Sequence, residues 1–308
     1  MSLLITGAAG FIGSNLLQNL STLYDSEIVI IDFLTEVSDP NIVSEFPNFY
    51  PVDISDRYMV DEIFNKHKPE YVFHLAAESH VDNSIQNCLP FINTNITGTV
   101  NLMNASLESG VKKFIHISTD EVYGALGKED LPFTEETPYD PQNPYSASKA
   151  ASDHFVQAYV NTYNLPAVIT NCSNNFGPRQ SNDKLIPKTI CNLLQGRRVP
   201  VYGKGEQIRD WLYVQDHCEA LVEVWKNGKV GEKYNIGGGT ELNNLTIVSR
   251  IIELMNKDQS NIEFVQDRPG HDFRYSIDCQ KIERELGWKS RFDFDEALLE
   301  TIKWYENY

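Results

Sequence analysis

The first 13 residues join a short apolar run to three evenly spaced glycines, and this combination constrains the fold more than any other feature. The run Ser2–Thr6 has the length and composition of a buried strand. Gly7, Gly10 and Gly13 follow in the pattern GxxGxxG, before a helical stretch begins. Glycines between a strand and a helix let the backbone approach a pyrophosphate, while the helix N-terminus faces the anion. The sequence therefore predicts a dinucleotide-binding turn.

A carboxylate follows this turn at a spacing that suits a dinucleotide site. Asp32, which ends the apolar stretch 27–32, lies 25 positions after Gly7. Such a carboxylate can accept hydrogen bonds from an adenosine ribose, and it repels the 2′-phosphate of NADP. No arginine follows directly, because residues 33–35 are uncharged. The sequence therefore favours NAD over NADP as the cofactor.

Apolar strands alternate with helical stretches through the first half of the chain. Predicted strands lie at residues 2–6, 27–32, 48–52, 71–75, 113–118 and 167–170. Asp56 is a predicted cap and Gly110 a predicted C-terminal glycine for two of the helices, which lie at residues 10–23, 56–67, 93–109 and 143–164. This alternation is typical of βαβ units, so we predict an α/β fold with a Rossmann-type, doubly wound parallel sheet.

The character of the sequence changes after about residue 171. Loops become longer, Gly and Pro recur, and helices are predicted at residues 185–194, 215–227, 245–257 and 294–305. We interpret residues 1–171 as an NAD-binding Rossmann domain and residues 172–308 as a smaller C-terminal lobe that binds the substrate. The boundary is approximate, and segments of the two parts can interleave.

Charge and cysteine content argue against several classes of protein. The formal net charge is −17 and the isoelectric point is near 4.8, which disfavours a nucleic-acid-binding or anionic-membrane surface. No stretch approaches the ~20 apolar residues of a membrane-spanning helix, and no signal peptide is evident. The five cysteines form no CxxC pair, and His74, His80 and His116 lack a ligand spacing, so no metal is expected. Free thiols favour a reducing, cytoplasmic location.

A tyrosine and a lysine lie four residues apart on the predicted helix 143–164. Tyr145 and Lys149 therefore share one helix face. A nearby ammonium favours the phenolate and lowers the pKa of the tyrosine, and the lysine can also hydrogen-bond a cofactor ribose. The pair follows the glycine turn by about 130 residues, like the catalytic pair of short-chain dehydrogenases/reductases.

Three further polar residues follow the predicted strand 113–118. They are Thr119, Asp120 and Glu121, and ligands of open α/β sheets bind at this end of the strands. Thr119 can hydrogen-bond a substrate hydroxyl. Two neighbouring carboxyl groups in a cleft can be divided by their environments into one acid and one base. The triplet is therefore a candidate for proton transfer beside Tyr145.

Long segments throughout the chain carry a resemblance to a known family. They include TGAAGFIGS, HLAAESHVDNSI, NTNITGT, STDEVYG, PYSASKAASDH, TNCSNNFGP, GKGEQIRDWLYVQDH, YNIGG and DRPGHDFRY. Over essentially its whole length, the chain resembles the nucleotide-sugar 4,6-dehydratases of the extended short-chain dehydrogenase/reductase family. Epimerases of this superfamily carry no Asp-Glu pair after the threonine, so the triplet at residues 119–121 separates the two groups.

This resemblance implies a lyase that converts a nucleoside-diphosphate glucose, with dTDP or UDP as the nucleotide, to the 4-keto-6-deoxy sugar and water. Tyr145 would remove the C4 hydroxyl proton as hydride passes to NAD, and Thr119 would hold the C4 oxygen. Glu121 would take the C5 proton, and Asp120 would protonate the departing C6 hydroxyl. The hydride then returns to C6, so NAD is expected to remain bound.

The resemblance also implies the remaining contacts, residue by residue. Expected cofactor contacts are Gly7, Gly10, Phe11, Ile12, Gly13, Asp32, Asp53, Ile54, Leu75, Ala76, Ala77, Thr94, Tyr145, Lys149 and Asn175. Expected substrate contacts are Ser79, Thr119, Asn174, Lys184, Arg209, Asn244, Arg268 and His271. A homodimer is implied as well, through the helices at 93–109 and 143–164, with Leu102, Met103, Phe155 and Tyr159 as apolar candidates.

Other functions remain open at this point. A nucleotide-sugar 4-epimerase or decarboxylase would keep Tyr145, Lys149 and the glycine turn, but neither needs Asp120 and Glu121. A catalytically silent NAD-sensing protein would be expected to lack part of this set. Residues 33–46 and 178–183 depart from the usual pattern of dTDP-glucose enzymes, so the nucleotide base is left undecided between thymine and uracil.

Overall fold

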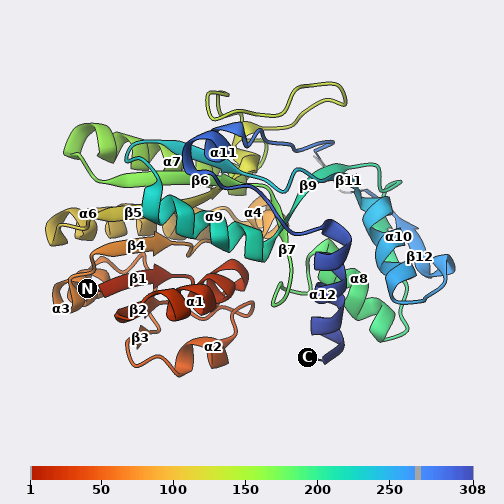
Figure 1. Ribbon diagram of the computed structural model, residues 1–308, viewed down its shortest axis with the longest axis horizontal. Helices are drawn as coiled ribbons and strands as arrows, with labels where there is room; N and C mark the ends of the chain where they lie inside the picture. The colour runs from red at the N-terminus through yellow and green to blue at the C-terminus, as the bar shows by residue number, and fades with distance from the viewer. Residues whose placement is uncertain (1, 268–271, 308) are drawn as a thin grey trace.

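A seven-stranded parallel sheet forms the centre of the molecule in the computed structural model, which describes residues 2–267 and 272–307 (Figure 1). Its strand order is β10-β6-β5-β4-β1-β2-β3. The chain starts at β1 inside the sheet, extends it to β3 on one side, and then builds the other side from β4. The strands are β1 Ser2–Thr6, β2 Glu27–Ile31, β3 Phe49–Tyr50, β4 Tyr71–His74, β5 Lys113–Thr119, β6 Ala167–Cys172 and β10 Lys233–Ile236. This arrangement confirms the predicted doubly wound fold.

Helices cover both faces of this sheet, because successive side chains of a strand point to opposite faces. Leu3 and Ile5 of β1 join a core shared with α1 (Phe11–Leu23) and α9 (Val214–Asn227). Leu4 joins the opposite core, which is shared with α3 (Arg57–His67), α6 (Thr99–Ser109) and α7 (Pro144–Tyr163). Two apolar layers therefore hold the sheet between helices.

Local sequence signals set the ends of several helices. The side chain of Asp56 accepts a hydrogen bond from the Met59 amide at 3.1 Å and caps α3, as predicted. Gly110 ends α6 with a φ of +70°, a conformation that favours glycine. Asn143 and Ser146 form a reciprocal capping box at the start of α7. This capping fixes where the helix that carries Tyr145 begins.

A smaller lobe lies beside the carboxyl ends of the central strands (Figure 1). Its three-stranded sheet has the order β11-β9-β7, and β12 pairs with β8 in a second small sheet. These strands are β7 Asn174–Phe176, β8 Val199–Tyr202, β9 Ile208–Tyr213, β11 Glu241–Asn243 and β12 Ile262–Val265. The helices of the lobe are α8 Leu185–Leu194, α10 Asn244–Leu254 and α12 Phe294–Asn307, whereas α11 Gln280–Leu286 lies against β10 and α9 beside the central sheet (Figure 1).

The second half of the chain also contributes to the central sheet. β10 pairs with β6 in parallel, and α9 packs against α1 on the sheet face. Both elements come after residue 172, so the two predicted parts of the chain interleave. The four helices predicted for this half are present as α8, α9, α10 and α12.

Several short elements were not predicted from the sequence. They are α2 Pro40–Ser44, α4 Val81–Gln86, α5 Leu89–Phe91, the π-helix η1 Ile92–Gly98 and the 3-10 helices η2 Asp120–Tyr123 and η3 Gln259–Asn261. The predicted helix at 93–109 is thus a π-helical turn that continues into α6. Among the described residues, no helix has the length and apolar character that crossing a membrane requires.

Candidate active site

The glycine turn after β1 is shaped by close backbone contacts. Gly7 has a φ of +73°, and a Cβ there would lie 2.6 Å from the amide nitrogen of Ala76. A Cβ at Gly13 would collide with the Gly7 carbonyl oxygen. Gly10 is the N-cap of α1 and offers no side-chain acceptor, so the amides of the first helical turn remain available to a bound anion. This geometry and donor set fit a pyrophosphate.

We expect Gly13→Ala to destabilise the protein far more than Gly10→Ala. The Cβ at residue 13 overlaps backbone, and overpacking of this kind costs roughly 1–3 kcal/mol in the free energy of unfolding. Gly10 has a φ of −79°, and a Cβ there meets only the Gly7 oxygen, at 3.4 Å. Urea unfolding of the two variants and the parent measures this. Equal midpoints for both variants would contradict the close packing of the turn.

Asp32 connects the glycine turn to the segment after β2 through hydrogen bonds. It is buried, and its carboxylate accepts hydrogen bonds from the Ala9 amide at 2.8 Å and the Leu34 amide at 2.9 Å. The carboxylate therefore lies directly beside the turn, where the sequence predicted an adenosine ribose. Phe11 and Ile12 are half-buried in the first turn of α1.

The loop after β4 lies next to the same turn. The amides of Leu75 and Ala76 bond the backbone oxygen and the hydroxyl of Thr6, at 3.2 and 3.1 Å. Ala77 and Ser79 follow in this loop, where Ala77 is half-buried and Ser79 is exposed. Strands β1, β4 and β5 run parallel, so their carboxyl ends bring the glycine turn, this loop and Thr119 to one edge of the sheet.

Asn95 holds this loop in place, a role that no pattern in the sequence indicated. The side chain lies in the π-helix, accepts a hydrogen bond from the Glu78 amide at 2.8 Å and donates to the Glu78 carbonyl at 3.0 Å. It also donates to the Ser148 hydroxyl on α7 at 2.8 Å. Thr94, which was predicted as a cofactor contact, is its half-buried neighbour. A buried amide in a π-helical turn, a structure frequent at functional sites, links two parts of the site.

Tyr145 and Lys149 lie on one face of α7, as their spacing predicted. The side chain of Thr119 at the end of β5 lies beside the Tyr145 hydroxyl. The Lys149 ammonium donates to the Ile117 carbonyl at 2.7 Å. The structure therefore brings the strand end and the Tyr-Lys pair together.

The expected lowering of the Tyr145 pKa is wrong for this structure. Burial raises the pKa of Tyr145 well above its usual value, and the carboxyl group of Glu121 raises it further. The ammonium of Lys149 is directed to the Ile117 carbonyl instead, and burial lowers the pKa of Lys149. Desolvation thus outweighs the effect expected from the sequence spacing.

Asp120 and Glu121 experience different environments although they are neighbours. Asp120 is 2% exposed, and its Oδ2 has no hydrogen-bond partner among the described residues. Burial raises the pKa of Asp120 well above its usual value, and Glu121 and Asp210 add to this. Burial also raises the pKa of Glu121, but Arg209 and a 3.5 Å hydrogen bond from Asn143 oppose the increase. Such a pair suits one acid and one base.

Two cations from the smaller lobe approach this pair. The guanidinium of Arg209 is buried, donates to the carbonyls of Ile208 and Asp272 at 2.7 and 3.0 Å, and lies over the Tyr275 ring at 4.5 Å. Lys184 begins α8, forms an ion pair with Asp183 at 3.0 Å and lowers the pKa of Glu121. Both were predicted as substrate contacts, and both act electrostatically on the acidic pair.

The other predicted contacts are more dispersed. Asn174 lies in β7, and its buried Oδ1 has no partner within the described part of the chain. Asn175 is paired with His217 at 2.9 Å, and Asn244 begins α10. Asp53 accepts from the Ser55 amide at 2.8 Å, and Ile54 is buried against Gly98. The predicted substrate contacts Arg268 and His271 lie outside the described residues.

His80 joins the two parts of the molecule, a role the sequence did not indicate. It precedes α4 and forms an ion pair with Asp183, just before α8, at 3.1 Å when protonated. His74 and His116 are buried, and burial lowers the pKa of both. No group of three or more His, Cys, Asp or Glu that could hold a metal occurs within residues 2–267 and 272–307.

Comparison with known proteins identifies the family. The model of the family described as GDP-mannose 4,6 dehydratase matches residues 4–301, so the chain belongs to this family. A dTDP-glucose 4,6-dehydratase from Haemophilus influenzae is 46% identical over 99% of this chain and 98% of its own length. A crystal structure of a dTDP-glucose 4,6-dehydratase from Streptomyces venezuelae with NAD bound has a TM-score of 0.95 and 39% identity, and the match covers 100% of this chain and 97% of that one. The predicted resemblance to nucleotide-sugar 4,6-dehydratases is confirmed.

The fold alone does not separate dehydratases from epimerases. A UDP-glucose 4-epimerase from Thermotoga maritima also has a TM-score of 0.95, at 30% identity, and the match covers 100% of this chain and 99% of that one. The distinction therefore depends on higher identity to dehydratases and on the residues at the end of β5.

Proposed function

We propose that this protein is an NAD-dependent dTDP-glucose 4,6-dehydratase, a lyase that forms the 4-keto-6-deoxy sugar and water. The observation that carries the proposal is the acidic pair Asp120 and Glu121 beside Thr119 and Tyr145. An epimerase needs the tyrosine but not the two carboxyl groups. The relatives named dTDP-glucose 4,6-dehydratases support thymidine over uridine as the nucleoside.

NAD fits the glycine turn, which offers uncapped helix amides to the pyrophosphate and the Asp32 carboxylate to a ribose. When bound, NAD supplies an acceptor and a donor of hydride. Gly7, Gly10 and Gly13 would lie against it, and Lys149 would hold a ribose hydroxyl. We propose that residues 1–171 with β10 and α9 form the cofactor-binding part, and that the smaller lobe binds the nucleotide sugar.

The side chains at the end of β5 would divide the proton transfers. Tyr145, as the phenolate, would accept the proton of the C4 hydroxyl, and Thr119 beside it would hold the C4 oxygen. Glu121 takes the C5 proton, because Arg209 and Asn143 oppose the rise in its pKa that burial causes. Asp120 is kept protonated by burial and donates its proton to the departing C6 hydroxyl. Arg209 and Lys184 would meet the anionic diphosphate.

A product assay by mass tests this function. The purified protein is incubated with dTDP-glucose and, separately, with UDP-glucose, without added NADH. We expect the dTDP sugar to lose one water. A product of unchanged mass with an inverted C4 centre would support the epimerase instead, and conversion of UDP-glucose alone would assign the other nucleotide.

We propose a homodimer that forms through α4, α5, η1 and α7. Leu102 and Met103 were predicted at this interface, but both are fully buried within the molecule, so that part of the prediction is wrong. An exposed apolar set lies on the same group of elements, namely Ile85, Leu89, Ile92 and Phe155.

The five free cysteines support a reducing compartment, and we propose the cytoplasm.

We expect sedimentation at micromolar protein concentration to show a dimer, and Phe155→Glu to convert it to a monomer. Phe155 is 44% exposed on α7, and a buried charge there would oppose association. Phe264→Glu is the control, because Phe264 is also an exposed phenylalanine, at 58%, but lies on β12 of the smaller lobe. A parent that sediments only as a monomer would refute the dimer.

A further inference from the structure

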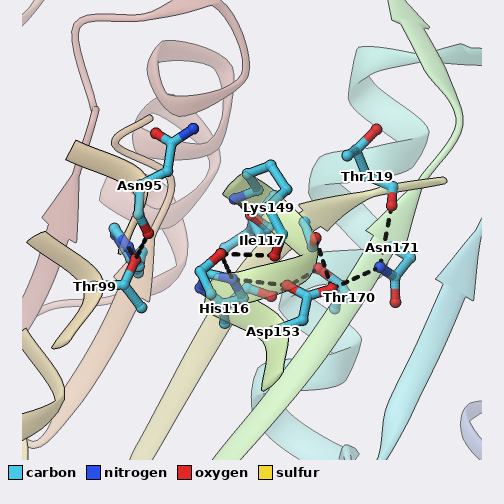
Figure 2. A network of polar contacts seen from close by, with 12 residues as sticks. Asn95, Thr99, His116, Ile117, Thr119, Lys149, Asp153, Thr170 and Asn171 are labelled. Atoms are coloured by element: carbon cyan, nitrogen blue, oxygen red, sulfur yellow. Dashed lines mark hydrogen bonds and ion pairs between the residues drawn. The ribbon is translucent and has the colours of Figure 1, made fainter. Parts of the chain in front are cut away.

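A buried carboxylate below the proposed site collects hydrogen bonds from three segments of the chain (Figure 2). Asp153 on α7 is 1% exposed. Its four donors are the His116 ring at 3.0 Å, the Ser118 hydroxyl at 2.9 Å, the Tyr139 hydroxyl at 2.9 Å and the Asn171 amide at 3.3 Å. They come from β5, from the loop before α7 and from β6. The proposed reaction gives this carboxylate no direct role.

The contacts of Asp153 surround the residue that holds Lys149. His116 and Ser118 point to the same face of β5, and Ile117 between them accepts the hydrogen bond of the Lys149 ammonium. Lys149 and Asp153 are four residues apart on α7, so they share a helix face. Asp153 therefore fastens α7 to β5 on both sides of the Lys149 contact.

Asn171 extends this connection to the end of β5. Its side-chain amide donates to Asp153 and also to the Thr119 carbonyl at 3.1 Å. Thr119 carries the hydroxyl that lies beside Tyr145. The Asn171 side chain therefore connects the Asp153 carboxylate to the end of β5, which bears the acidic pair.

Both His116, at 3.0 Å, and the more distant Lys149 on the same helix face stabilise the charge of Asp153. Burial lowers the pKa of His116, whose Nδ1 has no partner among the described residues, so the ring is neutral and donates from Nε2. Burial alone would raise the pKa of Asp153, but the hydrogen bond and the electrostatic attraction of His116, followed by the charge of Lys149, lower it. Lys149 is itself 5% exposed. A buried ion needs such compensation, because desolvation of an unpaired charge is costly.

We propose that Asp153 is a positioning residue of the dehydratase site, which fastens β5 to α7 and supplies the counter-charge of the Lys149 ammonium. This inference rests on the proposed function. Removing the charge while keeping the shape, as in Asp153→Asn, leaves Lys149 buried without its counter-ion. Lys149 then gives up its proton at a lower pH.

The experiment compares the pH dependence of two measurements. Its design must account for other titratable groups near Asp153 or Lys149. Those groups are His74, His116, Tyr123, Tyr139, Cys172 and Lys233. The two histidines have lowered pKa values and the tyrosines and the cysteine raised ones, so none of them titrates near neutral to mildly alkaline pH. Lys233 lies over the Tyr139 ring at 4.9 Å and also senses Asp153, so all variants are built in a Lys233→Met background.

The first measurement is the rate of bound NADH formation in a single turnover with dTDP-glucose. We expect the alkaline limb of its pH profile to move to lower pH by about 1–3 units in Asp153→Asn, the range produced by a neighbouring opposite charge. A role in folding alone would lower stability without moving this limb.

The second measurement is Tm against pH and needs no substrate. Lys149 has a lower pKa in the folded protein than in the unfolded chain. Between these two values the unfolded chain binds more protons, so stability rises with pH. Without Asp153 this rise begins at lower pH. We therefore expect the Tm of Asp153→Asn to lie below that of the parent, and this difference to become smaller as pH rises from about 7 to about 9.

Asp216→Asn is the matched control. Asp216 is a fully buried carboxylate on α9 that accepts three hydrogen bonds from residues 290–292, and we expect its Tm deficit to stay constant over this range. The proposal would be overturned if Asp153→Asn kept the alkaline limb of the parent pH–rate profile and if its difference in Tm from the parent did not change with pH. If that variant does not fold, Asp153→Glu replaces it: a slower rate with an unmoved limb supports the proposal, and an unchanged rate overturns it. A parent that converts no nucleotide sugar refutes the proposed function, whereas the Tm comparison still tests Asp153.

Discussion

Tyr145→Phe is expected to stop the proposed reaction before any NADH appears on the protein. The phenol oxygen is the group on α7 that meets Thr119, where the C4 hydroxyl would lose its proton. Loss of a general base costs about 10²–10⁴-fold in rate. Rapid-mixing absorbance of bound NADH with dTDP-glucose measures the first chemical step directly.

The control for this variant is a tyrosine on the same helix. Tyr163 is exposed at the end of α7, so Tyr163→Phe removes the same oxygen from a position remote from the site and should keep the parent rate. The role of Tyr145 is refuted if Tyr145→Phe forms NADH as fast as Tyr163→Phe does.

Asp120→Asn and Glu121→Gln are expected to oxidise the sugar but not to dehydrate it. Both amides keep the size of the side chain, but neither can exchange the proton that elimination requires. Oxidation at C4 depends on Tyr145 instead, so bound NADH should accumulate while the 6-deoxy product falls by about 10²–10⁴-fold. Absorbance of NADH and product mass, taken on the same samples, separate the two steps.

An acidic residue from the loop after η2 provides the control. Glu129 is exposed, and Glu129→Gln should dehydrate the sugar at the parent rate without a build-up of NADH. Parent-like dehydration by Asp120→Asn and Glu121→Gln would show that the two carboxyl groups do not serve as acid and base.

The sequence predicted the central fold well, because the signals for it are local. Apolar runs of strand length, glycine at a turn and capping side chains such as Asp56 act within a few residues. The π-helical turn at Asn95 depends instead on distant partners, namely the Glu78 backbone and Ser148. No local pattern could have predicted it.

The site shows the same division between local and distant causes. Spacing alone placed Tyr145 and Lys149 on one face and the acidic pair at a strand end. The pKa of Tyr145 could not be predicted in this way, because burial depends on every element packed around it. The contacts of Asp153 likewise require β5, β6 and α7 to be assembled.

The place of β10 at the edge of the central sheet has a consequence for how the molecule is made. During synthesis, β6 emerges long before β10, so its outer edge stays unpaired while some 60 further residues are added. The apolar face that α9 later covers is open over much of the same interval. Residues 1–171 therefore lack the strand and the helix that complete this side of the sheet. Truncation near residue 171 would leave a sheet with an unpaired edge and an uncovered apolar face, so we expect such a fragment not to fold by itself.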